Sequence, residues 1–218
     1  QAQGLNVGIV SRGYGGKAKE VPQLVFNASS AIEVGDEPLM IARRTDAPVC
    51  VHPNRALAVN HLIEHYEIDV VLSDDGLQHY SMHRDIEIVM IDGQRLFGNG
   101  FCIPAGPMRE GLERLKNVDR IVISGQTRLN LPELQNADTM QLVAHRLYNL
   151  RDPNQLTDLT QLQGRTIHAI AGLGNPQRFF STLENSGLRV VRHTFGDHHK
   201  FTAEDLDFEA SLIIMTEK

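Results

Sequence analysis

The sequence contains little cysteine, no excess of positive charge and no long apolar stretch. Its two cysteines, Cys50 and Cys102, lie in or beside apolar sequence and cannot define a disulfide framework, so we interpret them as small core residues in a reducing compartment. A formal net charge of -6 argues against a general nucleic-acid binder, because such proteins carry a basic excess or a basic stripe. No run of residues approaches the roughly 18 apolar residues of a membrane-spanning helix.

What the chain does contain is an alternation of short apolar runs with helix-length amphipathic segments. This alternation is typical of βαβ units and predicts an α/β fold with mostly parallel sheets. We expect helices that begin near Asp36, Pro53 and Pro176, and strands over residues 7–10, 48–51, 70–72, 86–91, 120–124, 166–171, 188–191 and 212–218. A polar, proline-containing stretch over 149–158 predicts a boundary between two Rossmann-like lobes, residues 1–150 and 151–218, with a ligand in the cleft between them.

The most informative segment is Ser73-Asp74-Asp75-Gly76-Leu77-Gln78-His79, which directly follows the apolar run 70–72. Open α/β sheets bind their ligands at the carboxyl ends of strands, which is where this segment falls. Two adjacent carboxylates repel each other, so placing both in a partly buried site usually requires a cation. The segment therefore predicts a metal or phosphate site, although Asp-Gly by itself is also a common turn.

Two further segments of the first lobe could take part in chemistry. The glycine-rich loop over residues 11–17 follows the first predicted strand, and its backbone N–H groups could approach an anion; a flexible surface turn explains it equally well. It is not a Gly-x-x-x-x-Gly-Lys-Ser/Thr loop, because Ala18 follows the lysine. Asp36 precedes Glu37-Pro38 and is suited to cap a helix, and a carboxylate fixed in this way can also serve as a general base or metal ligand.

In the second lobe, Asp197 lies next to His198 and His199. A carboxylate beside two imidazoles can orient a catalytic histidine or hold a metal, and a solvated loop is the alternative interpretation. Residues 172–176, Gly-Leu-Gly-Asn-Pro, follow a predicted strand, and we interpret them mainly as a tight strand-to-helix turn.

A rigid turn over residues 104–111 leads into a predicted helix that carries Arg114 and Lys116. Its Arg109 suits a phosphate or carboxylate group, unless it pairs locally with Glu110.

Considered from the residues alone, these groups support two different active sites. In the first, Asp74 and Asp75 bind Mg²⁺ in a phosphoryl-transfer site, and a carboxylate–imidazole pair activates a hydroxyl. In the second, a two-metal hydrolase centre is built from carboxylates and imidazoles, namely Asp36, Asp74, Asp75, His79, His198 and His199. The spacing of the residues does not decide between them.

Taken together, the segments resemble one family, the tetraacyldisaccharide 4'-kinases (lipid A 4'-kinases) of Gram-negative bacteria. The resemblance rests on seven segments, in the family's order, which span nearly the whole chain: Ser11-Arg-Gly-Tyr-Gly-Gly16, Val34-Gly-Asp-Glu-Pro38, Ser73-Asp-Asp-Gly-Leu-Gln-His79, Pro104-Ala-Gly-Pro-Met-Arg-Glu110, Gly172-Leu-Gly-Asn-Pro176, Gly196-Asp-His-His199 and Met215-Thr-Glu-Lys218. Each segment alone is weak evidence, whereas the ordered set is highly specific.

The resemblance implies a P-loop kinase-like fold and a kinase that uses ATP and Mg²⁺. It implies transfer of the γ-phosphate to the 4'-hydroxyl of a tetraacylated glucosamine disaccharide 1-phosphate, in lipid A (lipopolysaccharide) biosynthesis. The whole protein would be membrane-associated, acting on this lipid at the cytoplasmic face of the bacterial inner membrane, with no nucleic acid and no obligate protein partner. A two-metal Asp/His phosphoesterase and a non-catalytic nucleotide-binding module remain the alternatives.

The resemblance also implies a role for each matched residue. Asp36 matches the catalytic base, and His198 matches the imidazole that pairs with it. Asp74 and Asp75 match the Walker B-like pair that binds Mg²⁺. The remaining matched residues of the nucleotide and substrate site are Glu37, Gln78, His79, Arg109 and Glu110.

Several features expected of this family are missing from the 218 residues. The sequence holds neither the Gly-x-x-x-x-Gly-Lys-Thr loop expected just before Val7 nor an apolar N-terminal anchor, and Gly111 stands where a proline is expected. Sequence beyond Lys218 is also expected. We therefore expect the chain to be a fragment, incomplete at both ends, that binds ATP poorly and does not catalyse on its own.

Overall fold

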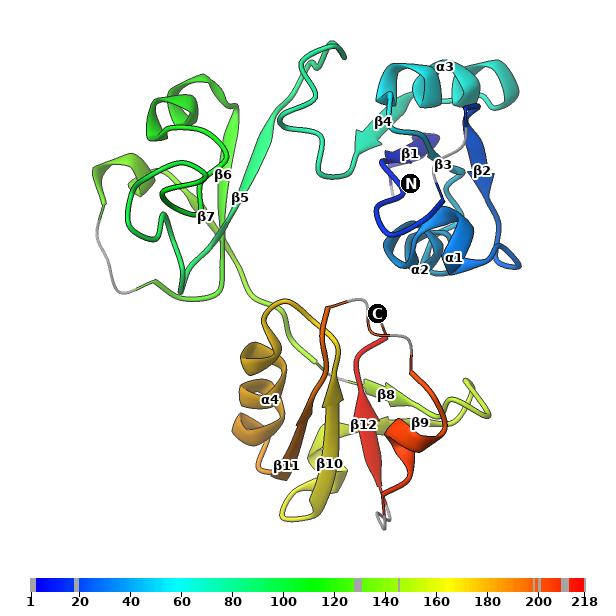
Figure 1. Ribbon diagram of the computed structural model, residues 1–218, viewed down its shortest axis with the longest axis vertical. Coiled ribbons are helices and arrows are strands. Elements are labelled where there is room, and N and C mark those ends of the chain that lie inside the picture. Colours follow the sequence, from blue (N-terminus) through cyan, green and yellow to red (C-terminus); the bar gives the residue numbers. More distant parts are fainter. Residues whose placement is uncertain are drawn as a thin grey trace. The chain divides into compact units, whose positions relative to one another are not determined.

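The structure is a computed structural model that describes residues 3–17, 20–127, 131–144, 146–197, 199, 201–208 and 212–217 (Figure 1). Contacts divide the chain into two units, Gln1–Asp75 with Ala144–Lys218, and Gly76–Val143. These units differ from the predicted lobes, residues 1–150 and 151–218, which stay a prediction about how the chain is organised.

The N-terminal part of the chain, up to Asp75, forms a four-stranded sheet with helices on both faces (Figure 1). The strand order is β2 (Gln23–Val25), β3 (Val49–Val51), β1 (Val7–Ser11) and β4 (Val70–Ser73). β1 runs parallel to both β3 and β4, whereas β2 pairs antiparallel with β3. The parallel pairing places the carboxyl ends of β1, β3 and β4 at one edge of the sheet.

Alternation along β3 explains why helices cover both faces of this sheet. Val49 and Val51 point to one face and pack in a cluster with Leu39 of α2 (Asp36–Arg44), which follows the short helix α1 (Ala31–Val34). Cys50 points to the other face and packs with Leu62 of α3 (Arg55–His65). The run Val-Cys-Val is apolar throughout because both faces are buried.

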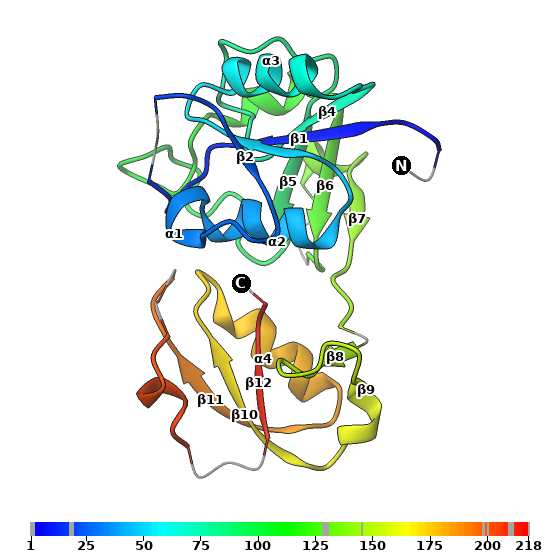
Figure 2. The same cartoon turned by 90° about the vertical axis from the view of Figure 1, so that its right-hand side faces the viewer.

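The last segment forms a parallel three-stranded sheet of order β11 (Arg189–Thr194), β10 (Thr166–Ala171) and β12 (Ile213–Met215). Helix α4 (Pro176–Asn185) buries Phe180 and Leu183 in one cluster with Ile167 and Ala169 of the central strand. Shorter elements complete the segment: the antiparallel pair β8 (Arg146–Tyr148) and β9 (Leu156–Asp158), and the 3₁₀ turns η3 (Leu159–Leu162) and η4 (Glu204–Leu206) (Figure 2).

The second unit contains a parallel sheet of order β5 (Ile88–Asp92), β6 (Arg120–Ser124) and β7 (Asp138–Met140). The 3₁₀ turns η1 (Leu112–Asn117) and η2 (Pro132–Leu134) lie in the connections between these strands, and the helix predicted to carry Arg114 and Lys116 is the 3₁₀ helix η1. Ile91, Ile123 and Leu134 form its buried cluster. Most strand pairs in the chain are parallel, which confirms the predicted α/β class.

The predicted helix starts are found within two residues of their expected positions. One helix begins at Asp36 with Gly35 at its N-cap, and another begins at Pro176. The helix expected from Pro53 begins at Arg55, because the side chain of Asn54 accepts the backbone N–H of Ala56 at 3.1 Å and caps the first turn. Among helices in the described ranges, none has the length and apolar content that crossing a bilayer requires.

Replacing Gly35 by alanine tests the tight packing before α2. Gly35 has a φ of +90°, and a Cβ added there would lie 2.7 Å from the carbonyl oxygen of Tyr14. We expect Gly35→Ala to lower the free energy of unfolding by about 1–2 kcal/mol from the left-handed backbone and a further ~1–3 kcal/mol from the overlap. Urea denaturation followed by circular dichroism measures the loss.

Gly4→Ala is the matched control, since Gly4 has a φ of +78° and nothing lies within 4 Å of its added Cβ. It should show the backbone cost alone. Equal losses for the two variants would contradict the packing argument.

Candidate active site

Polar groups gather at the carboxyl edge of the β1–β3–β4 sheet. Ser11 ends β1, and Asp74 directly follows the neighbouring strand β4. The backbone N–H of Asp74 donates to the carbonyl of Val10 at 2.9 Å, and the Ser11 hydroxyl donates to its Oδ2 at 3.2 Å. His52 follows β3 at the same edge, buried, with its N–H bonded to the Ser11 carbonyl at 3.1 Å. The strand pairing thus positions the first carboxylate of the Asp-Asp segment.

The electrostatic surroundings of Asp74 show which groups lie near it. Burial raises the pKa of Asp74, and the Ser11 hydrogen bond lowers it. The negative charges of Glu37 and Asp75 raise this pKa further, while the positive charge of Arg55 lowers it. The structure therefore brings the Asp36-Glu37 segment and the Asp74-Asp75 segment, which are far apart in sequence, into one electrostatic neighbourhood.

Asp36 is held in place at the start of α2. Its Oδ1 accepts the backbone N–H of Glu37 at 2.9 Å, and both side chains are half-buried. Asp36 is the first helical residue, so the expectation that it would itself be the cap is corrected: Gly35 occupies that position. The first turn of a helix favours negative charge, which suits two adjacent carboxylates there.

The glycine-rich loop over residues 11–17 packs against the residues that lead into α2. A Cβ at Gly16 would lie 2.6 Å from the carbonyl oxygen of Glu33 and 2.8 Å from the nitrogen of Gly35. The N–H of Lys17 also donates to the Ile32 carbonyl at 3.1 Å. Glycine is required here for the close approach of two backbones, and the anion-binding interpretation of this loop stays a prediction.

Arg55 is a charged residue of this edge that sequence reasoning missed. It is the first residue of α3 and only 5% exposed, and its Nη1 donates to the Pro53 carbonyl at 3.3 Å. Burial and the nearby charge of Arg12 lower its pKa, while Asp75 and Asp74 raise it. Its position after β3 was the available signal, because β3 ends at the same edge as β1 and β4.

The division into units passes through the Asp-Asp-Gly segment, between Asp75 and Gly76. Asp75 has a φ of +47°, a left-handed conformation that aspartate adopts more readily than most residues. His79 lies beyond this point, with its Nε2 3.1 Å from the Ser81 hydroxyl and its N–H bonded to the Gly76 carbonyl at 2.9 Å.

Within the second unit, the structure brings together the two predicted segments, 76–79 and 109–110. Arg109 donates from Nη1 to Oε1 of Gln78 at 3.2 Å. The hydroxyl of Tyr80 donates to Oε1 of Glu110. The Gln78 and Glu110 side chains are therefore held by contacts that join these loops.

An arginine–glutamate–arginine group supports these loops, and sequence reasoning missed it. Arg84 donates from Nη1 to the carbonyls of Gly76, Leu77 and His79, at 3.1, 3.0 and 3.3 Å. Its Nη2 pairs with Glu87 at 2.7 Å, and Glu87 pairs in turn with Arg114 at 2.5 Å. The side chains of all three residues are less than 20% exposed, so the ion pairs are shielded from solvent.

His198 lies outside the described residues. Its neighbour His199 pairs through Nε2 with Oδ2 of Asp205 at 3.0 Å, and this carboxylate also accepts from the N–H and hydroxyl of Thr202. The His199 and Thr202 hydrogen bonds lower the pKa of Asp205. The imidazole–carboxylate pair that the described residues show here is thus His199 with Asp205. Residues 172–175 connect β10 to α4, which confirms the strand-to-helix turn.

Comparison with known proteins identifies similar chains over the whole length. The family model described as LpxK, tetraacyldisaccharide-1-P 4'-kinase, matches residues 1–218. Tetraacyldisaccharide 4'-kinases from Methylobacillus flagellatus, Coxiella burnetii and Legionella pneumophila are 46%, 43% and 44% identical over 97%, 99% and 100% of the chain. The chain spans 62%, 62% and 65% of the length of these relatives.

A solved structure shares the fold. The crystal structure of the "apo" form of LpxK from Aquifex aeolicus in complex with ATP superposes with a TM-score of 0.74 at 26% sequence identity. The match covers 99% of this chain and 69% of that one. The expected P-loop kinase-like α/β fold is supported by this likeness.

The raised pKa of Asp74 predicts a pH-dependent effect of Asp74→Asn on stability. The folded chain holds the Asp74 proton more tightly than the unfolded chain, so the stability contribution of this carboxyl falls as pH rises above its ordinary value of 3.8. Asparagine still accepts from Ser11 without carrying charge. We expect Asp74→Asn to raise the unfolding midpoint at pH 7, with a gain that shrinks as pH falls towards 3.8.

Asp46→Asn, at an exposed aspartate, controls for the general loss of one negative charge. A gain for Asp74→Asn no larger than that of the control would contradict the argument. Thermal unfolding across the pH range provides the measurement.

Arg84→Ala tests whether this guanidinium holds the 76–79 loop. Removing it leaves three carbonyls without their charged donor and Glu87 with Arg114 as its remaining partner, so we expect faster backbone exchange at His79 and Met82, whose N–H groups close turns in this loop. Losing one hydrogen bond to a charged group costs about 1.5–3 kcal/mol. This corresponds to a roughly 10–100-fold faster rate of amide exchange. Hydrogen–deuterium exchange measures it. Arg120→Ala, at an exposed arginine, should leave these amides unchanged; equal exchange in both variants would refute the role.

Proposed function

Because the chain belongs to the tetraacyldisaccharide-1-P 4'-kinase family, we propose that the whole protein is an ATP-dependent lipid A 4'-kinase. It transfers the γ-phosphate of ATP to the 4'-hydroxyl of a tetraacylated glucosamine disaccharide 1-phosphate. The observation that carries this proposal to the chemistry is that the charge of Glu37, in the Asp36-Glu37 segment, acts on Asp74, which Ser11 holds at the carboxyl edge of the sheet. The activity is proposed for the whole protein, since the chain spans 62–65% of the length of the relatives that carry this name.

Asp36 is the proposed base that takes the proton from the sugar hydroxyl. A hydroxyl is a poor nucleophile at neutral pH, so its proton must leave as the phosphorus is attacked. The hydrogen bond from the Glu37 N–H fixes the Asp36 carboxylate at the start of a packed helix, which is the rigid support a base needs. His198 is the proposed imidazole that pairs with Asp36 and orients it.

Asp74 and Asp75 are the proposed ligands of Mg²⁺. The fit rests on Asp74, whose pKa is raised by burial and by the charges of Glu37 and Asp75, because a cation beside it would offset that burial and repulsion. Mg²⁺ needs only one or two protein carboxylates, with phosphates and water as its other ligands. When bound, it supplies neutralisation of charge on the β- and γ-phosphates.

The remaining proposed residues of the nucleotide and substrate site are Glu37, Gln78, His79, Arg109 and Glu110. Gln78 and Arg109 contact each other, and an arginine held by such a contact presents its other N–H groups in a fixed direction. Arg109 is the residue of this set suited to a phosphate or carboxylate of the substrate. Arg84 supports the set by holding the backbone that carries Gln78 and His79.

The proposed place of action follows from the proposed substrate. A disaccharide with four acyl chains stays in a bilayer, so the enzyme must reach it at a membrane surface. We place this at the cytoplasmic face of the bacterial inner membrane, where ATP is available, and propose neither a nucleic-acid partner nor an obligate protein partner.

Asp36→Asn in the whole protein tests the base. Asparagine can still accept from the Glu37 N–H, so the helix start is kept while the basic oxygen is lost. We expect kcat to fall by about 10²–10⁴-fold, with little change in ATP affinity. His198→Ala should act in the same direction. Measurement uses ³²P transfer to the disaccharide lipid and equilibrium binding of ATP, with Asp46→Asn as the control.

Unchanged turnover in both variants would refute the assigned pair. Cleavage of phosphate esters without ATP would favour the two-metal phosphoesterase, and ATP binding without any transfer would favour the nucleotide-binding module. The 218 residues alone should bind ATP weakly and transfer no phosphate.

A further inference from the structure

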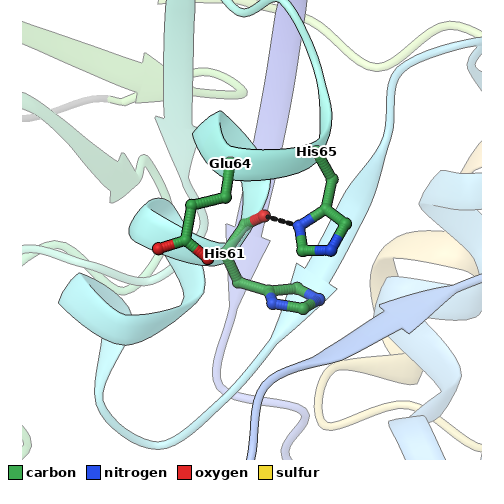
Figure 3. A group of neighbouring side chains, drawn as sticks. All are labelled: His61, Glu64 and His65. Carbon is green, nitrogen blue, oxygen red and sulfur yellow. Dashed lines mark hydrogen bonds between the residues drawn. The ribbon is translucent and has the colours of Figure 1, made fainter.

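Two histidines and a glutamate come together in the last turns of α3. His61, Glu64 and His65 occupy positions i, i+3 and i+4, which share one side of a helix (Figure 3). Each offers one ligand atom, and these atoms lie within 4.8 Å of one another. The two imidazole centroids are 4.3 Å apart. The proposed kinase chemistry uses none of the three residues.

The imidazole of His65 is oriented for binding through a defined nitrogen. Its Nδ1 lies 2.8 Å from the backbone carbonyl of His61 (Figure 3), and because a carbonyl can only accept, Nδ1 carries the proton. Nε2 then holds the lone pair. Histidines that bind metals usually donate their other ring N–H to a carbonyl or carboxylate in this way, which fixes both tautomer and ring direction.

The helix that carries these residues is anchored by two buried side chains in the same turns. Ala58 and Leu62 are 0% exposed and pack in the core with Val10 and Cys50. Glu64 and His65 are exposed, and His61 is half-buried, so an ion can reach the group from solvent. The helix backbone that carries the three ligands is thus ordered before an ion arrives, which lowers the ordering cost of binding.

We propose that His61, Glu64 and His65 form a binding site for a divalent transition-metal ion of the Zn²⁺ class, with water completing its coordination. Imidazole suits Zn²⁺, Ni²⁺ and Cu²⁺, whereas Mg²⁺ takes oxygen ligands, so this site differs in chemistry from the one proposed at Asp74 and Asp75. The same His-x-x-Glu-His spacing occurs on zinc-binding helices in which the two imidazoles hold the ion. Positive charge is also favoured at the C-terminal end of a helix, where this group lies.

An exposed polar helix face without any ion is the competing interpretation, and metal titration decides between the two. Isothermal titration of the chain with Zn²⁺ alone, and Co²⁺ binding followed by visible absorption, report stoichiometry and ligand type. We expect the chain to bind one equivalent of Zn²⁺, and the binding affinity to fall by at least about 10–100-fold in His61→Gln and in His65→Gln. Removing a group that only hydrogen-bonds a metal ligand already costs about 10–100-fold, and removing the ligand itself should cost no less. The unfolding midpoint of the unchanged chain should rise with Zn²⁺.

His83→Gln, at an exposed histidine of the second unit, is the matched control and should bind as the unchanged chain does. Circular dichroism of each metal-free variant checks that the fold is kept. Binding that is equal in the unchanged chain and the His61→Gln/His65→Gln double variant overturns the site. So does an absence of Zn²⁺ binding, or full displacement of Zn²⁺ by a modest excess of Mg²⁺.

Discussion

The carboxyl end of β1 is the constraint on which the rest of the candidate site depends. Its last residue, Ser11, bonds to Asp74 through the hydroxyl, which ties the neighbouring strand β4 to it. The loop that leaves β1 packs backbone against backbone on the residues before α2, and this contact leaves no room for a Cβ at Gly16 or Gly35. One strand end therefore positions both carboxylate segments, although they are nearly 40 residues apart in the sequence.

Placing the carboxylates of Glu37, Asp74 and Asp75 near one another destabilises the folded chain by charge repulsion. The positive charge of Arg55 compensates for this repulsion only in part. The pKa of Asp74 is raised because burial and the charges of Glu37 and Asp75 outweigh the Ser11 hydrogen bond and Arg55. Such a site is stabilised when a cation binds and strained when none is present, which is the usual condition of a site arranged for ligands rather than for stability. The buried Arg55 moderates the repulsion without removing it.

Much of this arrangement could be predicted from the sequence, because apolar strand patterns and the polar residues that follow them are local signals. The strands beside Ser11 and Asp74 and the helix start at Asp36 were all expected near where they lie. Arg55 and Arg84 could not be found in this way. Their importance comes from which carbonyls and carboxylates the fold places beside them, and a lone arginine in sequence carries no sign of that.

The glycine-rich loop and the unit boundary were less predictable for a different reason. Glycine permits both close backbone packing and approach to an anion, so the pattern alone cannot distinguish Gly16 packed on Glu33 from a phosphate cradle. Likewise, composition does not change between Asp75 and Gly76, where the contacts divide the chain.

Helix α3 lies between the two cation sites that we propose. Its first residue, Arg55, contributes to the charge balance of Asp74, and its last turns carry His61, Glu64 and His65. An 11-residue helix is marginal alone, so its order comes from the packing of Ala58 and Leu62 between these two ends. Because the carboxylates lie at the sheet edge and the imidazoles on the helix surface, the proposed Mg²⁺ and Zn²⁺ sites differ in ligand type as well as in position. An ion held at the last turns would therefore stabilise the helix that positions Arg55 without competing for the carboxylates.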